Sequence, residues 1–309
     1  SIGTIAAFIS YSRRFAEPLR QLGNLYNQVQ AALAGAERIF DLLDTVPDQS
    51  DAPGALHLSR VKGDVELDHV TFSYVPGVPV LQDICLHARP GERIALVGHT
   101  GAGKTTLVNL LSRFYDIDAG TIRIDGVDIL SVTRDSLRRQ LGVVLQQSFL
   151  FSESVLENIR YGRLGAGDEE VFAAARLAHA DGFIRRLPKG YATILSERGE
   201  SLSEGQRQLL AIARAILADP AILILDEATS SVDTRTELSI QQALNELMHG
   251  RTSFVIAHRL STISGADQVI VIDKGRVVEQ GTHDQLLARD GIFRRLYRSQ
   301  FRGRESQPE

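Results

Sequence analysis

The feature that most constrains the fold is a glycine-rich segment, GHTGAGKT, over residues 98–105. It follows the apolar run Arg93–Val97 and precedes a helical stretch from Lys104, which is the strand–loop–helix context of a phosphate-binding loop. Glycines let the backbone N–H groups turn inward toward a phosphate, and the following helix adds its positive end. Average residue usage gives a chance match in roughly one chain of this size in a hundred, so a plain glycine-rich turn is disfavoured.

The loop residues suggest a division of roles. Lys104 can reach the β- and γ-phosphates of a nucleotide, and the Thr105 hydroxyl can ligate Mg²⁺. The nucleotide-binding positions predicted here are Gly98, Thr100, Gly101, Ala102, Gly103, Lys104, Thr105 and Thr106.

A second motif, Asp226-Glu227, ends the continuous apolar run over residues 221–225. Such a run fits a parallel strand buried on both faces, and α/β sheets bind ligands at the carboxyl ends of such strands. Asp226 suits a water-mediated contact to Mg²⁺, and Glu227 suits polarising an attacking water. Alone the pair would be a solvated turn, but with the phosphate loop it indicates a P-loop nucleotide phosphatase or kinase.

A third motif, LSEGQRQ over residues 202–208, precedes an apolar-rich helical segment. It resembles the signature sequence of ABC ATPases, whose serine and glycine suit a helix N-terminus that donates N–H groups to a phosphate. The family pattern has glycine where this chain has Glu204, while Ser203, Gly205 and Gln206 match it. Because Glu204 adds a negative charge beside the expected γ-phosphate, we expect its side chain to point away from the ligand.

Two further residues acquire roles through this resemblance. Tyr74 resembles the aromatic residue that stacks on adenine; otherwise it would be a plain strand tyrosine. Gln146 resembles the Q-loop glutamine that senses Mg²⁺ and the membrane domain, and Gln147 is the competing assignment. The spacing to Leu150-Phe151 favours Gln146.

The remaining family motifs follow in the expected order. Ser230–Asp233 resembles the D-loop, which touches the partner subunit, and Asp233 is assigned to the nucleotide site with it. His258 resembles the switch histidine that contacts the γ-phosphate. A lone histidine after a strand is more often structural, but its place downstream of Asp226-Glu227 favours the functional role.

Three features favour an exporter within this family. Glu197-Arg198-Gly199 is similar to the short loop with which exporters contact the membrane domain. No long coiled-coil insertion separates Gln146 from Leu202. Residues 1–44, with apolar residues at three- and four-residue steps, predict a long helix that resembles the last membrane helix of exporters and its cytoplasmic extension.

The resemblance implies a domain order. Residues 1–44 are the C-terminal end of a transmembrane domain, 45–62 a linker, 63–302 the nucleotide-binding domain and 303–309 a tail. Hydropathy alone does not show a membrane span at the start of the chain. Its first 12 residues, apolar or small, would rise about 18 Å as a helix, against about 30 Å of hydrocarbon.

Composition narrows the function further. The formal net charge is −4, so no basic excess indicates nucleic acid or acidic lipid as a partner. The one cysteine, Cys85, falls in an apolar-alternating run and is interpreted as a small apolar strand residue; no zinc-like spacing is present.

These features together predict an α/β P-loop NTPase with a RecA-like core, an antiparallel β subdomain and a helical subdomain, preceded by a long α-helix. The resemblance implies ATP and Mg²⁺ as cofactors, a second nucleotide-binding domain and transmembrane domains as partners, and a cell-membrane location with the ATPase on the cytoplasmic side. Two alternatives remain: a soluble ABC ATPase in nucleic-acid or ribosome work, and a degenerate, ATP-binding half of a heterodimer.

Overall fold

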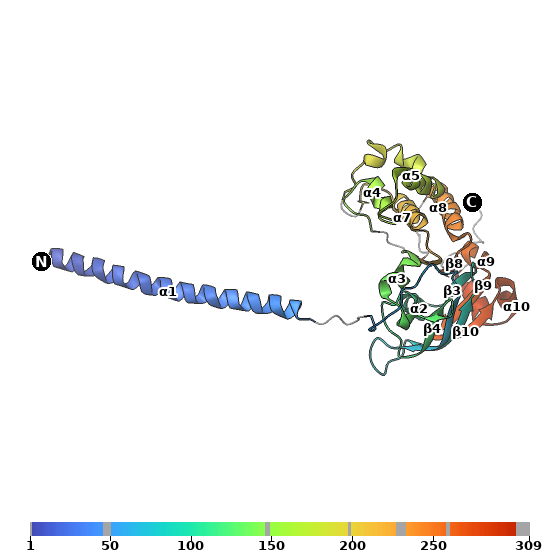
Figure 1. Cartoon of the computed structure of the whole chain (residues 1–309), viewed down its shortest axis with the longest axis horizontal. Helices are drawn as coiled ribbons and strands as arrows, with labels where there is room; N and C mark the ends of the chain where they lie inside the picture. The colour runs from blue at the N-terminus through green and yellow to red at the C-terminus, as the bar shows by residue number, and fades with distance from the viewer. Residues whose placement is uncertain are drawn as a thin grey trace. The chain divides into compact units, whose positions relative to one another are not determined.

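The computed structural model describes residues 2–45, 51–145, 149–196, 199–226, 233–257 and 260–300. The chain divides into two compact units, Ser1–Ser50 and Asp51–Glu309. The first is a single helix, α1 (Ile2–Leu43), as the periodicity of residues 1–44 predicts, and none of its residues is buried (Figure 1). Among the helices of the described residues, none combines the length and the apolar composition that crossing a membrane requires.

The second unit is built around a six-stranded sheet with the order β10-β9-β3-β8-β7-β6. Its neighbours pair in parallel, except that β10 is antiparallel to β9. The strands are β3 (Arg93–Val97), β6 (Leu141–Val144), β7 (Ile222–Asp226), β8 (Thr252–Ile256), β9 (Gln268–Asp273) and β10 (Arg276–Gly281). Apart from Asp226, every residue of β7 and β8 is buried, as expected for apolar strands covered on both faces.

A separate antiparallel sheet has the order β2-β1-β4-β5. Its strands are β1 (Val65–Phe72), β2 (Leu81–Ala88), β4 (Ala119–Ile124) and β5 (Val127–Asp128). Side chains of this sheet, of the six-stranded sheet and of α2 (Lys104–Leu111) form one apolar core, which includes Leu67, Ile94 and Leu107. The predicted antiparallel β subdomain is therefore confirmed, and its core holds α2 in place.

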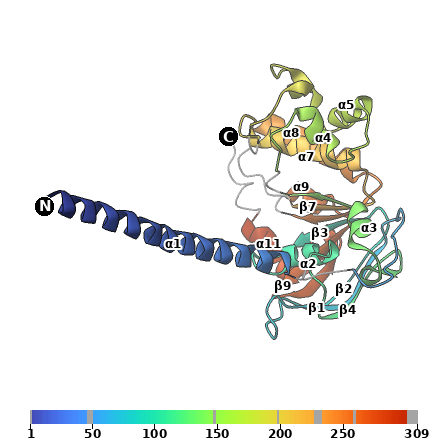
Figure 2. The same ribbon diagram turned by 60° about the vertical axis from the view of Figure 1, so that its left-hand side comes forward.

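A layer of helices packs against the part of the six-stranded sheet that contains β6 and β7 (Figure 2). Its longest members are α7 (Glu204–Ala218) and α8 (Thr234–Met248), which share an apolar core with the neighbouring helices and with β6 and β7. The remaining helices are α3 (Arg134–Arg139), α4 (Val155–Arg160), α5 (Asp168–Leu177), α6 (Asp181–Ile184), α9 (Leu260–Ser264), α10 (His283–Ala288) and α11 (Ile292–Gln300), with 3-10 turns at Ile129–Ser131 and Gly190–Ala192. The α/β class with a helical subdomain is confirmed.

The sequence patterns missed some elements. They gave no indication of β6, which is too short to show a pattern and is held by parallel pairing with β7. The patterns also missed β4, β5 and β10. α10 and α11 are separate helices, because the Glu279 carboxylate accepts hydrogen bonds from the backbone N–H groups of Ile292 and Phe293 at the start of α11.

Candidate nucleotide site

The phosphate-loop residues line a cavity of about 390 Å³ at the carboxyl end of the six-stranded sheet. The described residues that line it are Val80, Thr100, Gly101, Gly103, Lys104, Thr105, Thr106, Asp226 and Ile256. The predicted strand–loop–helix order is confirmed, since β3 ends at Val97 and α2 begins at Lys104. Because β3, β8 and β7 are consecutive parallel strands, their ends bring the loop, Ile256 and Asp226 together.

The loop has a conformation that its sequence selects. Gly103 has φ 109°, and a Cβ atom at this position would lie 2.6 Å from Leu81 Cδ2 of β2. Only glycine fits both requirements. The Ala102 N–H donates to His99 O at 3.1 Å, which closes the turn before α2. The loop is therefore fixed by its own hydrogen bonds and by packing against the antiparallel sheet.

The Lys104 side chain is fixed by hydrogen bonds to the phosphate loop. Its Nζ donates hydrogen bonds to Gly98 O at 2.7 Å and to His99 O at 2.9 Å, and the residue is only 8 % exposed. Burial lowers the pKa of the ammonium group, and the charge of Asp226 opposes that shift. An ammonium group has three hydrogen-bond donors. The Lys104 ammonium can therefore donate to the two loop carbonyls and still donate to an anion in the cavity.

Two oxygen-bearing side chains in this cavity suit a metal ion. Thr105 contributes a hydroxyl and Asp226 a carboxylate, and both belong to the lining. Hydroxyl, carboxylate and phosphate oxygens are the ligands that Mg²⁺ prefers, usually with several waters retained. The residues present therefore fit Mg²⁺ held between the protein and a bound phosphate.

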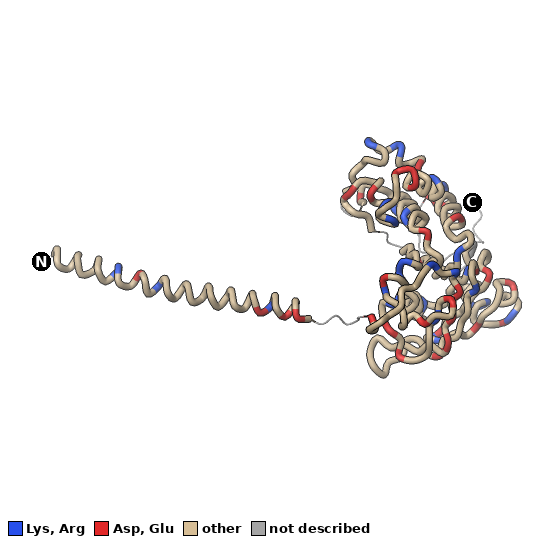
Figure 3. The backbone as a smooth tube through the Cα atoms, in the orientation of Figure 1, with Lys and Arg blue, Asp and Glu red and all other residues tan. Residues whose placement is uncertain are grey.

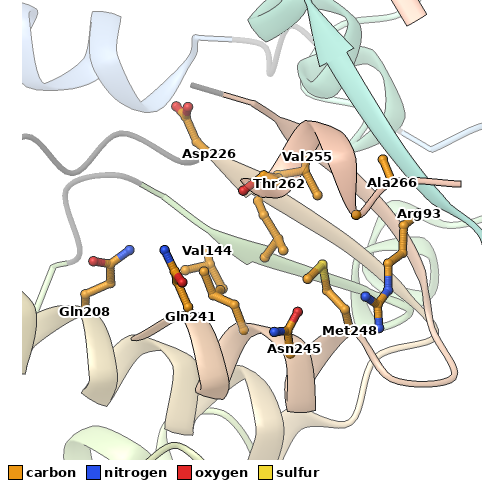
Figure 4. Close-up of a pocket in the computed structure, with 13 residues that line it drawn as sticks. Arg93, Val144, Gln208, Asp226, Gln241, Asn245, Met248, Val255, Thr262 and Ala266 are labelled. Carbon is orange, nitrogen blue, oxygen red and sulfur yellow. The ribbon is translucent and has the colours of Figure 1, made fainter. Parts of the chain in front are cut away.

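Asp226 also borders a second cavity, of about 100 Å³, between the sheet and the helical layer (Figure 4). Gln208 from α7 and Gln241 and Asn245 from α8 line it opposite the strands. Gln208 is only 5 % exposed, and its Oε1 has no hydrogen-bond partner within the described parts of the chain. Asp226 therefore borders both the phosphate-loop cavity and a second cavity that side chains of both long helices line.

Tyr74 lies beside the first turn of α2. It follows β1, which ends at Phe72. The Tyr74 hydroxyl donates to Thr106 Oγ1 at 3.2 Å, and its ring meets Tyr115 edge to face at 5.0 Å. The ring is 45 % exposed, so a planar ligand can reach it. The sequence did not single out Tyr115, because the contact joins distant segments and no local pattern marks it.

The signature residues begin α7, where the motif predicts a helix N-terminus. Ser203 Oγ accepts a hydrogen bond from the Gln206 N–H at 3.2 Å, and the Ser203 N–H donates to Gln206 Oε1 at 3.1 Å. Gly205 is buried and Glu204 half-buried. None of these residues is in the described lining of the phosphate-loop cavity. Within one chain, the structure therefore brings together the loop and Asp226 but not the signature.

Asp233 caps α8. Its carboxylate accepts a hydrogen bond from the Thr236 N–H at 3.0 Å, and this bond lowers the pKa of Asp233. The carboxylate is therefore charged and oriented at a helix N-terminus.

Several predicted positions lie outside the described residues. These are Gln146, Gln147, Glu197, Arg198, Glu227, Ser230, Ser231, Val232 and His258.

An aromatic groove that the sequence did not predict lies between β6, α4 and α7. It is lined by Leu141, Gly142, Val143, Val144, Leu145, Phe149, Phe151, Tyr161, Gly162, Ala211, Arg214, Ala215 and Ala218. Phe149 and Tyr161 are each 55 % exposed. Arg214 donates to Phe149 O and lies over the rings of Phe151 and Tyr161 at 5.6 and 5.3 Å. The groove thus presents an aromatic surface whose side chains are held in place by the guanidinium of Arg214.

Comparison with known proteins gives consistent matches. The family model described as ABC transporter matches residues 81–230. The chain is 54 % identical over 299 residues to the fatty acid ABC transporter ATP-binding/permease protein of Mycobacterium bovis. The aligned region covers 97 % of this chain and 47 % of the relative. It is 49 % identical over 300 residues to the ATP-dependent lipid A-core flippase of Syntrophus aciditrophicus, covering 97 % and 50 %.

A solved structure agrees with these matches. The structure of a bacterial Atm1-family ABC exporter with ATP bound has 43 % sequence identity and a TM-score of 0.83, over 95 % of this chain and 50 % of that chain. The present chain therefore spans about half the length of the relatives that it matches.

Proposed function

Since this chain belongs to the ABC transporter family through its ATP-binding domain, we propose that it is the ATP-hydrolysing part of an ABC exporter. In this proposal two such domains meet head to tail around ATP, and hydrolysis drives substrate across the cell membrane from the cytoplasmic side. The relatives named for fatty acid transport and lipid A-core flipping support transport as the purpose of the ATPase.

One observation carries the head-to-tail arrangement. The phosphate loop and Asp226 line one cavity, whereas the described signature residues at the start of α7 line none of it. A helix N-terminus with N–H groups directed outward suits a phosphate that another molecule presents. The signature of one chain would therefore complete the site of its partner.

The residues of the site divide the work as follows. Lys104 and the loop N–H groups bind the β- and γ-phosphates, and Tyr74 stacks on the adenine. Thr105 and Asp226 hold Mg²⁺, together with Gln146; the ion would neutralise phosphate charge. Glu227 orients a water in line with the γ-phosphate.

Residues of both chains stabilise the charge that develops in the transition state. His258 contacts the γ-phosphate from the same side as the phosphate loop. Ser203, Gly205 and Gln206 of the opposing copy approach from the other side, and Asp233 lies at the junction.

Three features support coupling to a membrane domain. The aromatic groove offers exposed Phe149 and Tyr161, a surface that suits an apolar segment from a partner. The Glu197-Arg198 loop would make a second contact. Most of α1 carries no charge, and its apolar residues are exposed (Figure 3). We therefore assign residues 1–44 to the end of the membrane domain, 45–62 to a linker and 63–302 to the ATPase.

The test is the ATPase rate per chain against chain concentration, with Mg²⁺, for the unaltered protein and for Glu227→Gln. We expect the rate per chain to rise with concentration. In Glu227→Gln we expect the ATPase rate to fall at least about 100-fold while ATP binding is retained. Glu246→Gln, an exposed change on α8, is the matched control and should leave the rate intact.

Two outcomes would contradict the proposal. A rate per chain that is independent of concentration would argue against a shared site. Full turnover in Glu227→Gln would remove Glu227 from the role of orienting water.

A further inference from the structure

The pairing of β1 with β2 is interrupted at residues that do not belong to the described lining of the phosphate-loop cavity. The register runs from Leu67↔Leu86 to Val70↔Ile84, so two residues of β1 oppose one residue of β2. This two-against-one count is a β-bulge, which turns side chains toward a common point. The three residues of this bulge are Asp68, His69 and Cys85.

The bulge gathers three different ligand types. Asp68, His69 and Cys85 each offer one ligand atom, and these atoms lie within 4.8 Å of one another. His69 Nε2 is 3.8 Å from Asp68 Oδ1, and the His69 backbone N–H donates to Cys85 Sγ at 3.4 Å. Cys85 lies on β2, in a strand as the sequence predicts, and its side chain is exposed.

A fourth residue orients the histidine. Asp83 Oδ1 lies 2.5 Å from His69 Nδ1, so the carboxylate accepts the Nδ1 proton and leaves Nε2 as the ring nitrogen directed to a ligand. A carboxylate behind an imidazole is the arrangement that orients metal-binding histidines and raises their basicity.

The bulge is built into the sheet on its other side as well. Gly120 of β4 has φ 88°, and a Cβ atom there would lie 2.4 Å from His69 O and 2.5 Å from Asp68 O. His69 itself has φ 51°, a conformation that L residues rarely adopt. A side chain on β4 would therefore displace the bulge, and glycine at this position preserves it.

We propose that Asp68, His69 and Cys85 bind a divalent transition metal of the Zn²⁺ type, with Asp83 positioning the histidine. Nitrogen, sulfur and carboxylate oxygen are the zinc ligands, and a tetrahedral site separates them by about 3.3–3.8 Å, which small rotations of exposed side chains reach. Binding would release the Cys85 thiol proton to solvent. Three protein ligands leave one position for water.

The test uses the full, untagged chain without nucleotide and with excess Mg²⁺, which occupies oxygen-ligand sites. Zn²⁺ is titrated in competition with a chromophoric chelator. We expect one tight equivalent per chain, lost in Cys85→Ser and in His69→Asn, and weakened about 10- to 100-fold in Asp83→Asn. Asparagine tolerates the backbone conformation at positions 69 and 83, so these variants should fold.

The same strand provides a matched control. His87 Nε2 lies 2.8 Å from Asp64 Oδ1, which is a histidine–carboxylate pair without a thiol. His87→Asn should leave the zinc affinity unchanged. If His87→Asn and His69→Asn weaken zinc binding equally, the metal is held by scattered surface histidines and the proposal is wrong.

A second readout needs no variant. Cys85 is the only cysteine of the chain, so the rate of thiol alkylation reports on this position alone. Zn²⁺ should slow alkylation at least tenfold, and removing the ion with a chelator should restore the rate. Unchanged alkylation at saturating Zn²⁺ would show that Cys85 is not a ligand. Because neither experiment uses ATP, failure here leaves the proposed ATPase untouched.

Discussion

At the scale of single residues, Lys104 has two tasks at one atom. Its Nζ ties Gly98 O and His99 O together, and it places a buried positive charge in the wall of the phosphate-loop cavity. The two tasks are linked, because a phosphate in the cavity would compete with the carbonyls for the same donors. Loss of the side chain should therefore affect the loop as well as the ligand.

We predict that Lys104→Ala lowers the ATPase rate by at least about 100-fold and weakens ATP binding, because the phosphate charge loses its nearest cation. Isothermal titration with ATP and a phosphate-release assay would measure both effects. Lys189→Ala, which removes an exposed lysine elsewhere, is the control and should change neither value. Unaltered ATP affinity in Lys104→Ala would show that the backbone N–H groups alone hold the phosphates.

At the scale of elements, the start of α7 combines stability with function. Ser203 and Gln206 satisfy each other's backbone N–H groups, so the helix is capped before any partner arrives. α10 begins with the same reciprocal arrangement between Thr282 and Gln285, at a place with no proposed role. A comparison of the two caps therefore separates the contribution of a cap to stability from the contribution of Ser203 to ATP turnover.

We predict that Ser203→Ala costs about 1 kcal/mol of unfolding free energy and also lowers ATP turnover. Ser203→Asp should keep the cap and the stability, yet lower turnover further, because it places a negative charge toward the partner's γ-phosphate. Urea unfolding and ATPase assays would measure the two effects.

Thr282→Ala is the control for this pair. It should cost a similar free energy and leave the ATPase rate unchanged. Equal turnover in Ser203→Asp and the unaltered chain would exclude the start of α7 from the phosphate site.

Across the whole molecule, the two units differ in how much of their apolar side-chain surface is buried. Residues 51–309 hold the apolar cores of both sheets and of the helical layer. α1 has no buried residue, and large apolar side chains such as Ile2, Phe15 and Leu42 are at least 75 % exposed. A helix with such a surface is stabilised by partners that cover it.

We predict that a chain of residues 51–309 is monodisperse in buffer without detergent, binds ATP and unfolds cooperatively, because its cores lie entirely within it. The full chain should self-associate or require detergent, since α1 exposes apolar surface. Light scattering on a sizing column would compare the two. Equal, monomeric behaviour of both chains without detergent would show that the surface of α1 needs no cover.

Local patterns were enough to predict much of the fold. The periodicity of residues 1–44 gives α1, the apolar run before Asp226 gives β7, and the glycine-rich segment gives the loop between β3 and α2. Each depends on neighbours in the chain: helical spacing, continuous apolar residues, or glycines in series. The same holds for the helix start at Ser203, where a capping residue precedes its partner by one turn.

Features that depend on contacts between distant segments could not be predicted in this way. β6 is a strand because Leu141 pairs with Ile222, and α11 starts where Glu279 accepts two N–H groups. Tyr115 lies against Tyr74 for the same reason.

The cluster around Cys85 shows this division most sharply. No spacing in the sequence indicates a metal, because the ligands come from two strands and a bulge turns them together. Local sequence patterns alone specify α1, β7, the phosphate loop and the start of α7, since the energetics of these elements are local. The tertiary structure decided which side chains meet, because register, bulges and close backbone approach depend on residues far apart in the chain.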